Sequence, residues 1–353
     1  MTAAHRPERT VLVTGGAGFV GSSLVRELLD TGRYRVVTLD ALTYAGHRAS
    51  LKAVSDDPRH VFVHGDITDA DVVEAAFEVH HPDAVLHLAA ESHVDRSIDG
   101  PAAFLRTNVT GTYHLLQEAR RHWQGRDDVR FVHVSTDEVF GSLDPDDPPF
   151  TPSTRYDPRS PYAATKAASD HLARAWQHTY GVPVLVTNCS NNYGPRQYPE
   201  KLIPTVILTA ARGQRIPVYG TGANVRDWLH VRDHARGLIA ALERGGPGAT
   251  YLFGARNEHD NLTLVRMLCD LLDELRPSGA PHRELIEFVE DRPGHDLRYA
   301  IDPARAEREL DWRPDTRFED GLRETVRWYL DHEAWVEEIL AGEHELGRRG
   351  VLP

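Results

Sequence analysis

Cysteine is scarce in this chain, which has two among its 353 residues, Cys189 and Cys269, and no CxxC pair. A disulfide framework or a cysteine-bound zinc site needs more cysteines at closer spacing, so neither is supported, and we expect two buried thiols. His87, His93 and His230 lack the regular spacing of metal ligands and are interpreted as structural histidines. We predict no metal site.

Long apolar runs are also missing, so no segment is predicted to span a bilayer, although a hydrophobic content of 41% supplies a substantial core. The opening residues, MTAAHRPERT, are polar and lack the apolar stretch of an export signal, so we expect a cytoplasmic protein. Positive charge is in deficit, with a formal net charge of -13. This balance opposes binding to nucleic acid or to an anionic membrane, and we expect neither partner.

The first half of the chain alternates short β-branched runs with helical patterns. Strands are predicted at Thr10–Val13, Arg35–Leu39, Val61–His64, Ala84–Leu88 and Arg130–Val134, with helices between them such as Ser22–Asp30 and Asp69–Val79. This alternation predicts an α/β fold, a doubly wound parallel sheet of the Rossmann type, over residues 1–185.

After about residue 183 the pattern becomes irregular, with proline and glycine punctuation and helices expected at Leu262–Leu275 and Glu319–Ile339. We predict a smaller α/β substrate-binding domain, mainly residues 186–353, with a segment near 229–255 returning to the first domain. The residues from Gly342 onward are expected to form a weakly held tail.

A glycine-rich turn follows the first predicted strand. Gly15 permits the tight turn, Gly18 lets a pyrophosphate approach the backbone, and Gly21 lets helix and strand pack closely. Asp40 ends the second strand, where a carboxylate accepts both ribose hydroxyls and repels a 2′-phosphate, which favours NAD over NADP. An ordinary glycine turn is the alternative. Asp66, after the third strand, is placed for an adenine contact, although such an aspartate is more often a helix cap.

Two further motifs follow the predicted strand that ends at Val134. Tyr162 and Lys166 are four residues apart and share a helical face, so that Lys166 and an oxidised nicotinamide could lower the pKa of the phenol. An exposed helical pair is the simpler alternative. Asp137 and Glu138 directly follow Thr136 and could supply the acid and the base that a dehydration requires. Their alternative is an acidic helix N-terminus without a chemical role.

With these motifs assembled, the chain closely resembles the dTDP-glucose 4,6-dehydratases of the extended short-chain dehydrogenase/reductase superfamily over nearly its full length. The supporting strings are TGGAGFVG from Thr14, DALTYAG from Asp40, HLAAESHVDRSI from His87, STDEVFG from Ser135, SPYAATK from Ser160, CSNNYGP from Cys189, PEKLIP from Pro199, VRDWLHV from Val225 and DRPGHDLRYAID from Asp291. The resemblance implies oxidation of a nucleotide-activated hexose at C4, loss of water across C5 and C6, and reduction at C6.

The resemblance also implies roles for residues. Tyr162 takes the C4 hydroxyl proton, Thr136 holds the C4 oxygen, Lys166 binds the nicotinamide ribose, Glu138 removes the C5 proton and Asp137 protonates the C6 hydroxyl. The implied NAD contacts are Gly15, Gly18, Phe19, Val20, Gly21, Asp40, Thr43, Asp66, Ile67, Ala89, Ala90, Tyr162, Lys166 and Asn192. The implied substrate contacts are Ser92, His93, Asn191, Glu200, Lys201, Leu202, Pro217, Tyr219, Arg226, Asn257, Arg292 and His295.

Several alternatives stay open at this stage. The sequence departs from the usual family pattern at Phe140, Asn188 and Arg196. Because Asn188 and Arg196 lie close to the substrate motif, UDP- or CDP-glucose remains a candidate substrate beside dTDP-glucose. A nucleotide-sugar 4-epimerase or decarboxylase would share the fold but needs no acidic pair, and a silent NAD-binding regulator would not need the Tyr/Lys pair. Members of the family pair two helices per subunit, which here implies a homodimer through Pro101–Arg121 and Tyr162–Tyr180.

Overall fold

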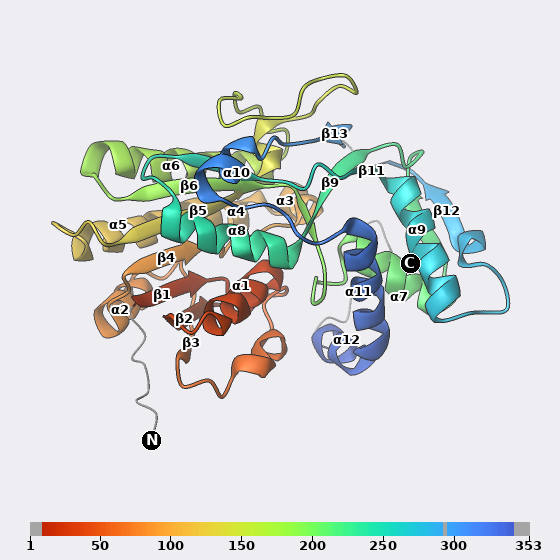
Figure 1. Ribbon diagram of the computed structural model, residues 1–353, viewed down its shortest axis with the longest axis horizontal. Coiled ribbons are helices and arrows are strands. Elements are labelled where there is room, and N and C mark those ends of the chain that lie inside the picture. Colours follow the sequence, from red (N-terminus) through yellow and green to blue (C-terminus); the bar gives the residue numbers. More distant parts are fainter. Residues whose placement is uncertain (1–8, 292–294, 342–353) are drawn as a thin grey trace.

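The computed structural model describes residues 9–291 and 295–341, and its centre is a parallel sheet of seven strands (Figure 1). The strands run in the order β10-β6-β5-β4-β1-β2-β3. Their bounds are β1 Arg9–Thr14, β2 Tyr34–Asp40, β3 His60–His64, β4 Ala84–His87, β5 Arg130–Thr136, β6 Val184–Cys189 and β10 Thr250–Phe253. The order reverses between β1 and β4, and ligands of such sheets bind at the carboxyl edge of this switch point.

The strands form where the sequence is apolar on both faces. Val11, Leu12 and Val13 of β1 are each fully buried, as expected for a parallel strand covered by helices on both sides. All five predicted strands are present, and each begins and ends within two residues of its expected bounds.

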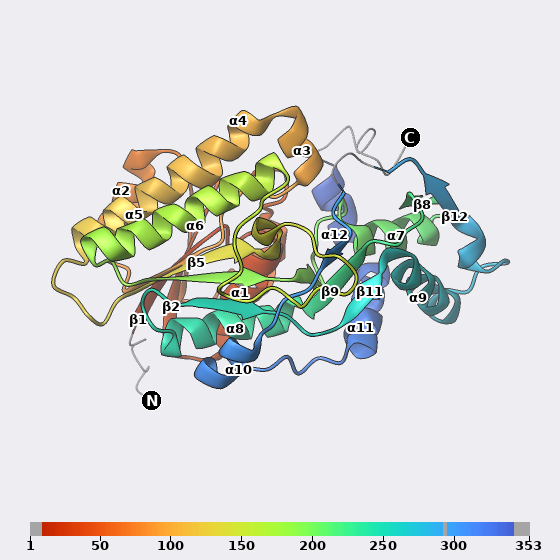
Figure 2. The same cartoon turned by 90° about the horizontal axis from the view of Figure 1, so that it is seen from above.

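Helices cover both faces of this sheet (Figure 2). One face carries α2 (Ala70–His80), α5 (Thr112–His122) and α6 (Pro161–Tyr180), and the other carries α1 (Phe19–Asp30), α8 (Val231–Arg244) and α10 (Ala304–Leu310). Leu24, Leu238 and Trp312 belong to the apolar cluster on the α1 side, whereas Phe77 and Leu116 belong to the cluster on the α2 side. The doubly wound fold is confirmed.

A smaller group of elements adjoins this sheet. Strand β9 (Val225–His230) pairs with β7 (Asn191–Tyr193), β11 (Glu258–Asp260) and β13 (Arg298–Tyr299), and β8 (Ile216–Tyr219) pairs with β12 (Ile286–Val289). Helices α7 (Leu202–Ala211), α9 (Asn261–Leu275), α11 (Phe318–Asp331) and α12 (Glu333–Leu340) complete it. Between these elements the chain returns to the large sheet through α8 and β10, and again through α10.

The C-terminal helix prediction is wrong in one respect. The segment Glu319–Ile339 is two helices, since α11 ends at Asp331 and α12 begins at Glu333. His332 between them has non-helical backbone angles, and its ring Nδ1 lies 2.8 Å from the carbonyl oxygen of Trp328. Trp328 and Trp335 therefore lie on different helices, although their rings still meet at 4.9 Å. The predicted tail from Gly342 onward lies outside the described residues.

The segment predicted as one helix from Pro101 to Arg121 is also composite. After α3 (Val94–Asp99), it comprises α4 (Pro101–Phe104), a π-helical stretch (Leu105–Gly111) and α5. The π-helical stretch contains the buried Asn108, whose side chain bonds both the backbone N–H and the carbonyl of Glu91. Interrupted helices of this kind are frequent at functional sites, and Glu91 lines the pocket described below.

Candidate active site

The glycine-rich turn after β1 is closed so tightly that side chains would not fit. A Cβ on Gly21 would lie 2.1 Å from the Gly15 carbonyl oxygen, and a Cβ on Gly15, whose φ is +70°, would lie 2.7 Å from the backbone nitrogen of Ala89. The turn leads into α1, which begins at Phe19 with Gly18 as its N-terminal cap. A helix N-terminus with bare backbone in front of it suits a diphosphate.

Asp40 is fixed at the end of β2 by the backbone. Its Oδ2 accepts from Ala17 N and its Oδ1 from Leu42 N, both at 2.8 Å. Burial raises the pKa of Asp40, and the two backbone N–H groups oppose that rise. Asp66 does not cap α2, because Asp69 does so, and Asp66 instead closes a turn through Thr68 N. Both aspartates line the pocket.

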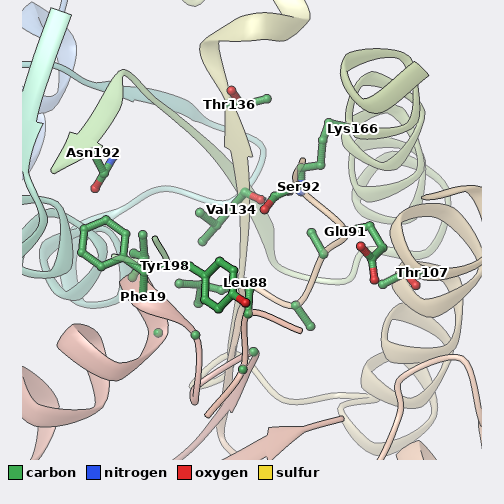
Figure 3. A pocket seen from close by; sticks show the side chains of 18 of the residues that line it. Phe19, Leu88, Glu91, Ser92, Thr107, Val134, Thr136, Lys166, Asn192 and Tyr198 are labelled. Carbon is green, nitrogen blue, oxygen red and sulfur yellow. Dashed lines mark hydrogen bonds between the residues drawn. The ribbon is translucent and has the colours of Figure 1, made fainter. Parts of the chain in front are cut away.

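One pocket of about 350 Å³ collects most of the predicted site residues along the carboxyl edge of the large sheet. Every residue predicted to contact NAD or to act in catalysis lines it, and so do four predicted substrate residues, Ser92, Asn191, Glu200 and Lys201. In Figure 3, Asn192 lies on the left of the pocket, Lys166 lies on the right, and Thr136 lies at the top between them. The glycine turn and the Asp40 carboxylate in this pocket fit a dinucleotide.

The Tyr162–Lys166 pair is held at the start of α6. Ser160 caps this helix by accepting from Ala163 N, and Pro161 occupies its first position. Lys166 is buried and its Nζ donates to the Val134 carbonyl at 2.8 Å, while Tyr162 shares a hydrogen bond with the Thr136 side chain. The alternative of an exposed helical pair is therefore wrong, because both side chains are buried in the pocket.

The pKa of Tyr162 is raised well above that of an ordinary phenol, first by burial and then by the charge of Glu138. Burial also lowers the pKa of Lys166, which the carboxylate of Asp170 opposes. The expected depression of the phenol pKa is therefore not achieved by the surrounding side chains. It requires additional positive charge in the pocket, of the kind that an oxidised nicotinamide carries.

The acidic pair lies where β5 ends. Thr136 Oγ1 accepts from Glu138 N at 3.3 Å and so caps the short 3₁₀ helix Asp137–Phe140. Asp137 is only 2% exposed, and its pKa is raised well above the ordinary value, mainly by burial and next by Glu138. Arg226 pulls that pKa in the opposite direction. Burial therefore favours the protonated form of Asp137, unlike that of a solvated residue at a helix N-terminus.

The remaining predicted substrate residues that the structure describes do not line the pocket. They are His93, Leu202, Pro217, Tyr219, Arg226, Asn257 and His295. Several gather in the smaller group of elements: Arg226 Nη2 donates to the Asp296 carbonyl at 3.0 Å, and the Tyr219 and His295 rings lie 6.3 Å apart. Because Arg226 acts on the pKa of Asp137, this cluster adjoins the acidic pair. Arg292 lies outside the described residues.

Comparison with known proteins agrees with this geometry. Residues 12–325 match the model of the GDP-mannose 4,6 dehydratase family. The dTDP-glucose 4,6-dehydratase 1 of Escherichia coli (strain K12) is 53% identical over 348 residues, which cover 95% of this chain and 96% of that protein. The chain belongs to the dTDP-glucose 4,6-dehydratase family. A crystal structure of the family member from Streptomyces venezuelae, with NAD bound, superposes with a TM-score of 0.86 at 49% identity, covering 94% of this chain and 99% of that one.

The fold alone does not separate dehydratases of this family from epimerases. The UDP-glucose 4-epimerase of Thermus thermophilus, solved in complex with NAD, reaches a TM-score of 0.81 at 28% identity, covering 92% of this chain and 99% of that one. The acidic pair after Thr136 is the feature from which the sequence predicts a dehydration.

Several residues that line the pocket were not predicted from the sequence, and His234 is the one whose contacts bear most directly on a predicted site residue. His234 in α8 lines the pocket, and its Nδ1 lies 2.8 Å from Asn192 Oδ1. Burial lowers the pKa of His234 to about 3, so the ring is neutral and Nδ1–H donates to Asn192. The Asn192 amide also donates to the Ser190 carbonyl at 2.8 Å, which fixes its orientation. His234 stands alone in a helical sequence 42 residues from its partner, so no motif marks it.

Neither a metal centre nor a membrane span is found in residues 9–291 and 295–341. No group of three or more His, Cys, Asp or Glu side chains there is arranged to hold a metal ion. None of the helices in those ranges combines the length and the apolar character that crossing a membrane would take.

Proposed function

We propose that this protein converts dTDP-glucose to dTDP-4-keto-6-deoxyglucose by C4 oxidation, elimination of water across C5 and C6, and reduction at C6, with bound NAD. The observation that carries the proposal is the acidic pair, a buried Asp137 beside a half-buried Glu138, which lines one pocket together with Thr136, Tyr162 and Lys166. The relatives named dTDP-glucose 4,6-dehydratase support the same reaction.

The residues that would hold NAD are the glycine turn for its diphosphate, Asp40 for the adenosine ribose, Lys166 for the nicotinamide ribose and Asn192 beside the nicotinamide. When bound, NAD supplies the redox chemistry at C4 and C6. Because the oxidation and the reduction cancel within one turnover, NADH is not expected to accumulate in solution. A protein that required NADPH, or that released one NADH per product, would contradict this part of the proposal.

Tyr162 begins the reaction by accepting the proton of the C4 hydroxyl. Thr136, which shares a hydrogen bond with Tyr162, donates to the C4 oxygen and holds it beside the phenol. Lys166 is anchored on the Val134 carbonyl, which places its positive charge at the base of the pocket. This charge, added to that of the oxidised cofactor, favours the phenolate over the neutral phenol.

Elimination follows oxidation because the C5 proton is acidic only beside a C4 ketone. Glu138 removes that proton, and Asp137 donates its own proton to the departing C6 hydroxyl. The raised pKa of Asp137 supports this division of roles, since the donor must be protonated at the pH at which its neighbour acts as a base. An epimerase would have no use for a buried acid at this position.

The cluster around Arg226, Tyr219 and His295 is proposed to bind the nucleotide diphosphate, with Tyr219 stacking on the base. Lys201 lines the pocket and supplies further positive charge. Thymine, uracil and cytosine differ only at their edges, so the preference for one base depends on the contacts made to those edges. UDP-glucose and CDP-glucose are the alternatives.

Incubation of the purified protein with dTDP-, UDP- and CDP-glucose tests the proposal directly. We expect a 4-keto-6-deoxy product from dTDP-glucose and slower or no reaction with the other two. A C4 epimer would favour the epimerase instead. NAD binding without conversion of any of the three would favour a regulatory protein.

We also propose that the enzyme works in the cytoplasm without nucleic-acid or membrane partners, which the net charge of -13 supports. The division of labour between a dinucleotide domain, residues 1–185 with a segment near 229–255, and a substrate domain, mainly residues 186–353, is likewise part of the proposal. The return of α8 and β10 to the large sheet supports it.

A further inference from the structure

Three segments far apart in the sequence meet beside the pocket. Residues 41–47 follow β2, and Thr43, Ala45 and Gly46 of this loop line the pocket. Residues 92–96 include the first turn of α3, and residues 198–201 precede α7 in the smaller group of elements. Ser92, Tyr198, Glu200 and Lys201 of these two segments line the same pocket. The contacts among the three segments decide how firmly the loop 41–47 closes it.

Tyr44 is the residue of the loop that makes these contacts. The guanidinium carbon of Arg96 lies 3.6 Å from the centre of the Tyr44 ring, which is the shortest cation–π separation among the described residues. The Tyr44 ring also meets the Tyr198 ring edge to face at 5.6 Å, and His47 stacks on Tyr198 at 5.8 Å. The loop is thus held between α3 on one side and the segment before α7 on the other.

Charged contacts join the other two segments to each other. Glu200 Oε2 lies 3.9 Å from Arg96 Nε and 3.5 Å from His93 Nε2, and its side chain is only 9% exposed. Lys201 Nζ donates to the Ser92 carbonyl at 3.4 Å. Arg96 therefore contacts the loop through Tyr44 and the segment before α7 through Glu200.

We propose that Arg96 is a positioning residue that, by stacking on Tyr44, holds the loop 41–47 closed against the dinucleotide and slows its release. The inference rests on the proposed function, because it takes the bound dinucleotide to be NAD. A dehydratase that regenerates its cofactor in each turnover gains from slow release, since an enzyme that loses NAD between the two redox steps abandons its intermediate. Neither Arg96 nor Tyr44 lines the pocket, so the effect acts through the loop.

Release of NAD from the holoenzyme tests the proposal without using activity. Protein loaded with radiolabelled NAD is mixed with excess unlabelled NAD, and protein-bound label is followed by rapid gel filtration. We expect Arg96→Leu and Tyr44→Leu each to release NAD about 2-fold to 30-fold faster than wild type, the range expected for loss of a partly desolvated cation–π pair. Tyr44→Phe, which keeps the ring, should release it more slowly than Tyr44→Leu does.

A double-mutant cycle distinguishes a direct effect of the Arg96–Tyr44 contact on the loop from a general loosening of the fold. If Arg96 and Tyr44 act together, the Arg96→Leu/Tyr44→Leu double variant releases NAD no faster than the faster single variant, whereas independent effects multiply. Arg305→Leu is the matched control, because Arg305 lies over the Tyr251 ring at 5.2 Å and neither residue lines the pocket. It should release NAD at the wild-type rate.

Wild-type release rates in both single variants would overturn the proposal, as would multiplied effects in the double variant or equal acceleration by Arg305→Leu. These failures differ from failure of the proposed function, in which the wild-type protein would form no 4-keto-6-deoxy product from dTDP-glucose, whether or not it binds NAD.

Discussion

At the scale of single residues, Asp137 shows how burial converts a common side chain into a specialised acid. Aspartate normally titrates near pH 4, so at neutral pH it is a poor proton donor. Burial and the adjacent Glu138 favour its protonated form in the folded protein. Glu138, Tyr162 and Lys166 line the same pocket, so donor and acceptors are within reach of one bound sugar.

The raised pKa of Asp137 predicts a pH-dependent gain in stability from Asp137→Asn. A raised folded-state pKa means that the folded protein binds more protons than the unfolded one, so its stability falls as pH rises from about 4 towards the folded-state pKa. Asparagine mimics the protonated acid at every pH. The melting temperature of Asp137→Asn should therefore match wild type near pH 4 and exceed it increasingly above, then level off. A difference that does not change with pH would contradict the raised pKa.

Variants of the catalytic residues should separate oxidation from elimination. Tyr162→Phe removes the base that starts C4 oxidation, so turnover should fall by about 10²-fold to 10⁴-fold and no reduced nicotinamide should form. Asp137→Asn and Glu138→Gln leave the oxidising residues intact and block a later step, so enzyme-bound reduced nicotinamide should accumulate. Rapid-mixing absorbance with dTDP-glucose distinguishes the two patterns. Wild-type turnover in both acidic variants would remove the main support for the elimination roles.

At the scale of elements, the features that could be predicted from the sequence are those that depend on residues close together in the chain. Strand β1, the glycine turn and the capped start of α6 follow from residues next to one another, and all were predictable. The break at His332 was not, because the helical periodicity of apolar residues continues across it while one side chain bonds the preceding turn. The π-helical stretch at Asn108 was equally hidden, since its partner Glu91 is 17 residues away.

The substrate cluster shows the same limit for the site. Ser92 and Lys201, predicted from motif positions as substrate contacts, line the pocket. Whether Tyr219 and His295 line it too depends on how β8 and the residues before β13 fold together. His234 was missed for the same reason. Its role in the site depends on one contact with Asn192, which lies 42 residues away in the sequence. Sequence patterns identify the chemical groups within a motif, whereas the distances between residues of different motifs can be known only from the folded structure.

The glycine turn offers a test at this scale. Gly21→Ala would push a Cβ against the Gly15 carbonyl at 2.1 Å, which should cost about 1–3 kcal/mol of stability and distort the turn that faces the diphosphate. Gly246→Ala is the matched control, since a Cβ there meets nothing within 4 Å. Urea unfolding and NAD content after gel filtration measure both effects. Equal stability and equal NAD content in the two variants would contradict the close packing of the turn.

At the scale of the whole molecule, one helical face carries exposed apolar side chains. Ile98 is 50% exposed, Leu105 55%, Tyr113 40% and Tyr180 45%, and all four lie on or at the ends of the helical segments from α3 to α6. The helices α5 and α6 pack side by side on one face of the sheet (Figure 2). Phe104, Leu115 and Leu116 of the same helical segments are buried within the chain and do not contribute to this exposed face.

We predict that this face joins two copies of the chain in a C2 homodimer. Light scattering at micromolar concentration should give twice the monomer mass, and Leu105→Asp together with Tyr113→Asp should shift it towards the monomer. Phe288→Asp, at a residue 57% exposed on β12 and distant from this face, should leave the dimer intact. A monomeric wild-type protein would contradict the prediction.

The proposed reaction makes one demand on the product that no epimerase meets. If Glu138 removes the C5 proton and elimination precedes reduction, C5 must take a new proton from solvent. The decisive measurement is therefore proton NMR of the product formed from dTDP-glucose by the wild-type protein in deuterium oxide. We predict a 4-keto sugar with a C6 methyl group and deuterium at C5. A C4 epimer that retains its C6 hydroxyl and its original hydrogen at C5 would contradict the assignment of Asp137 and Glu138.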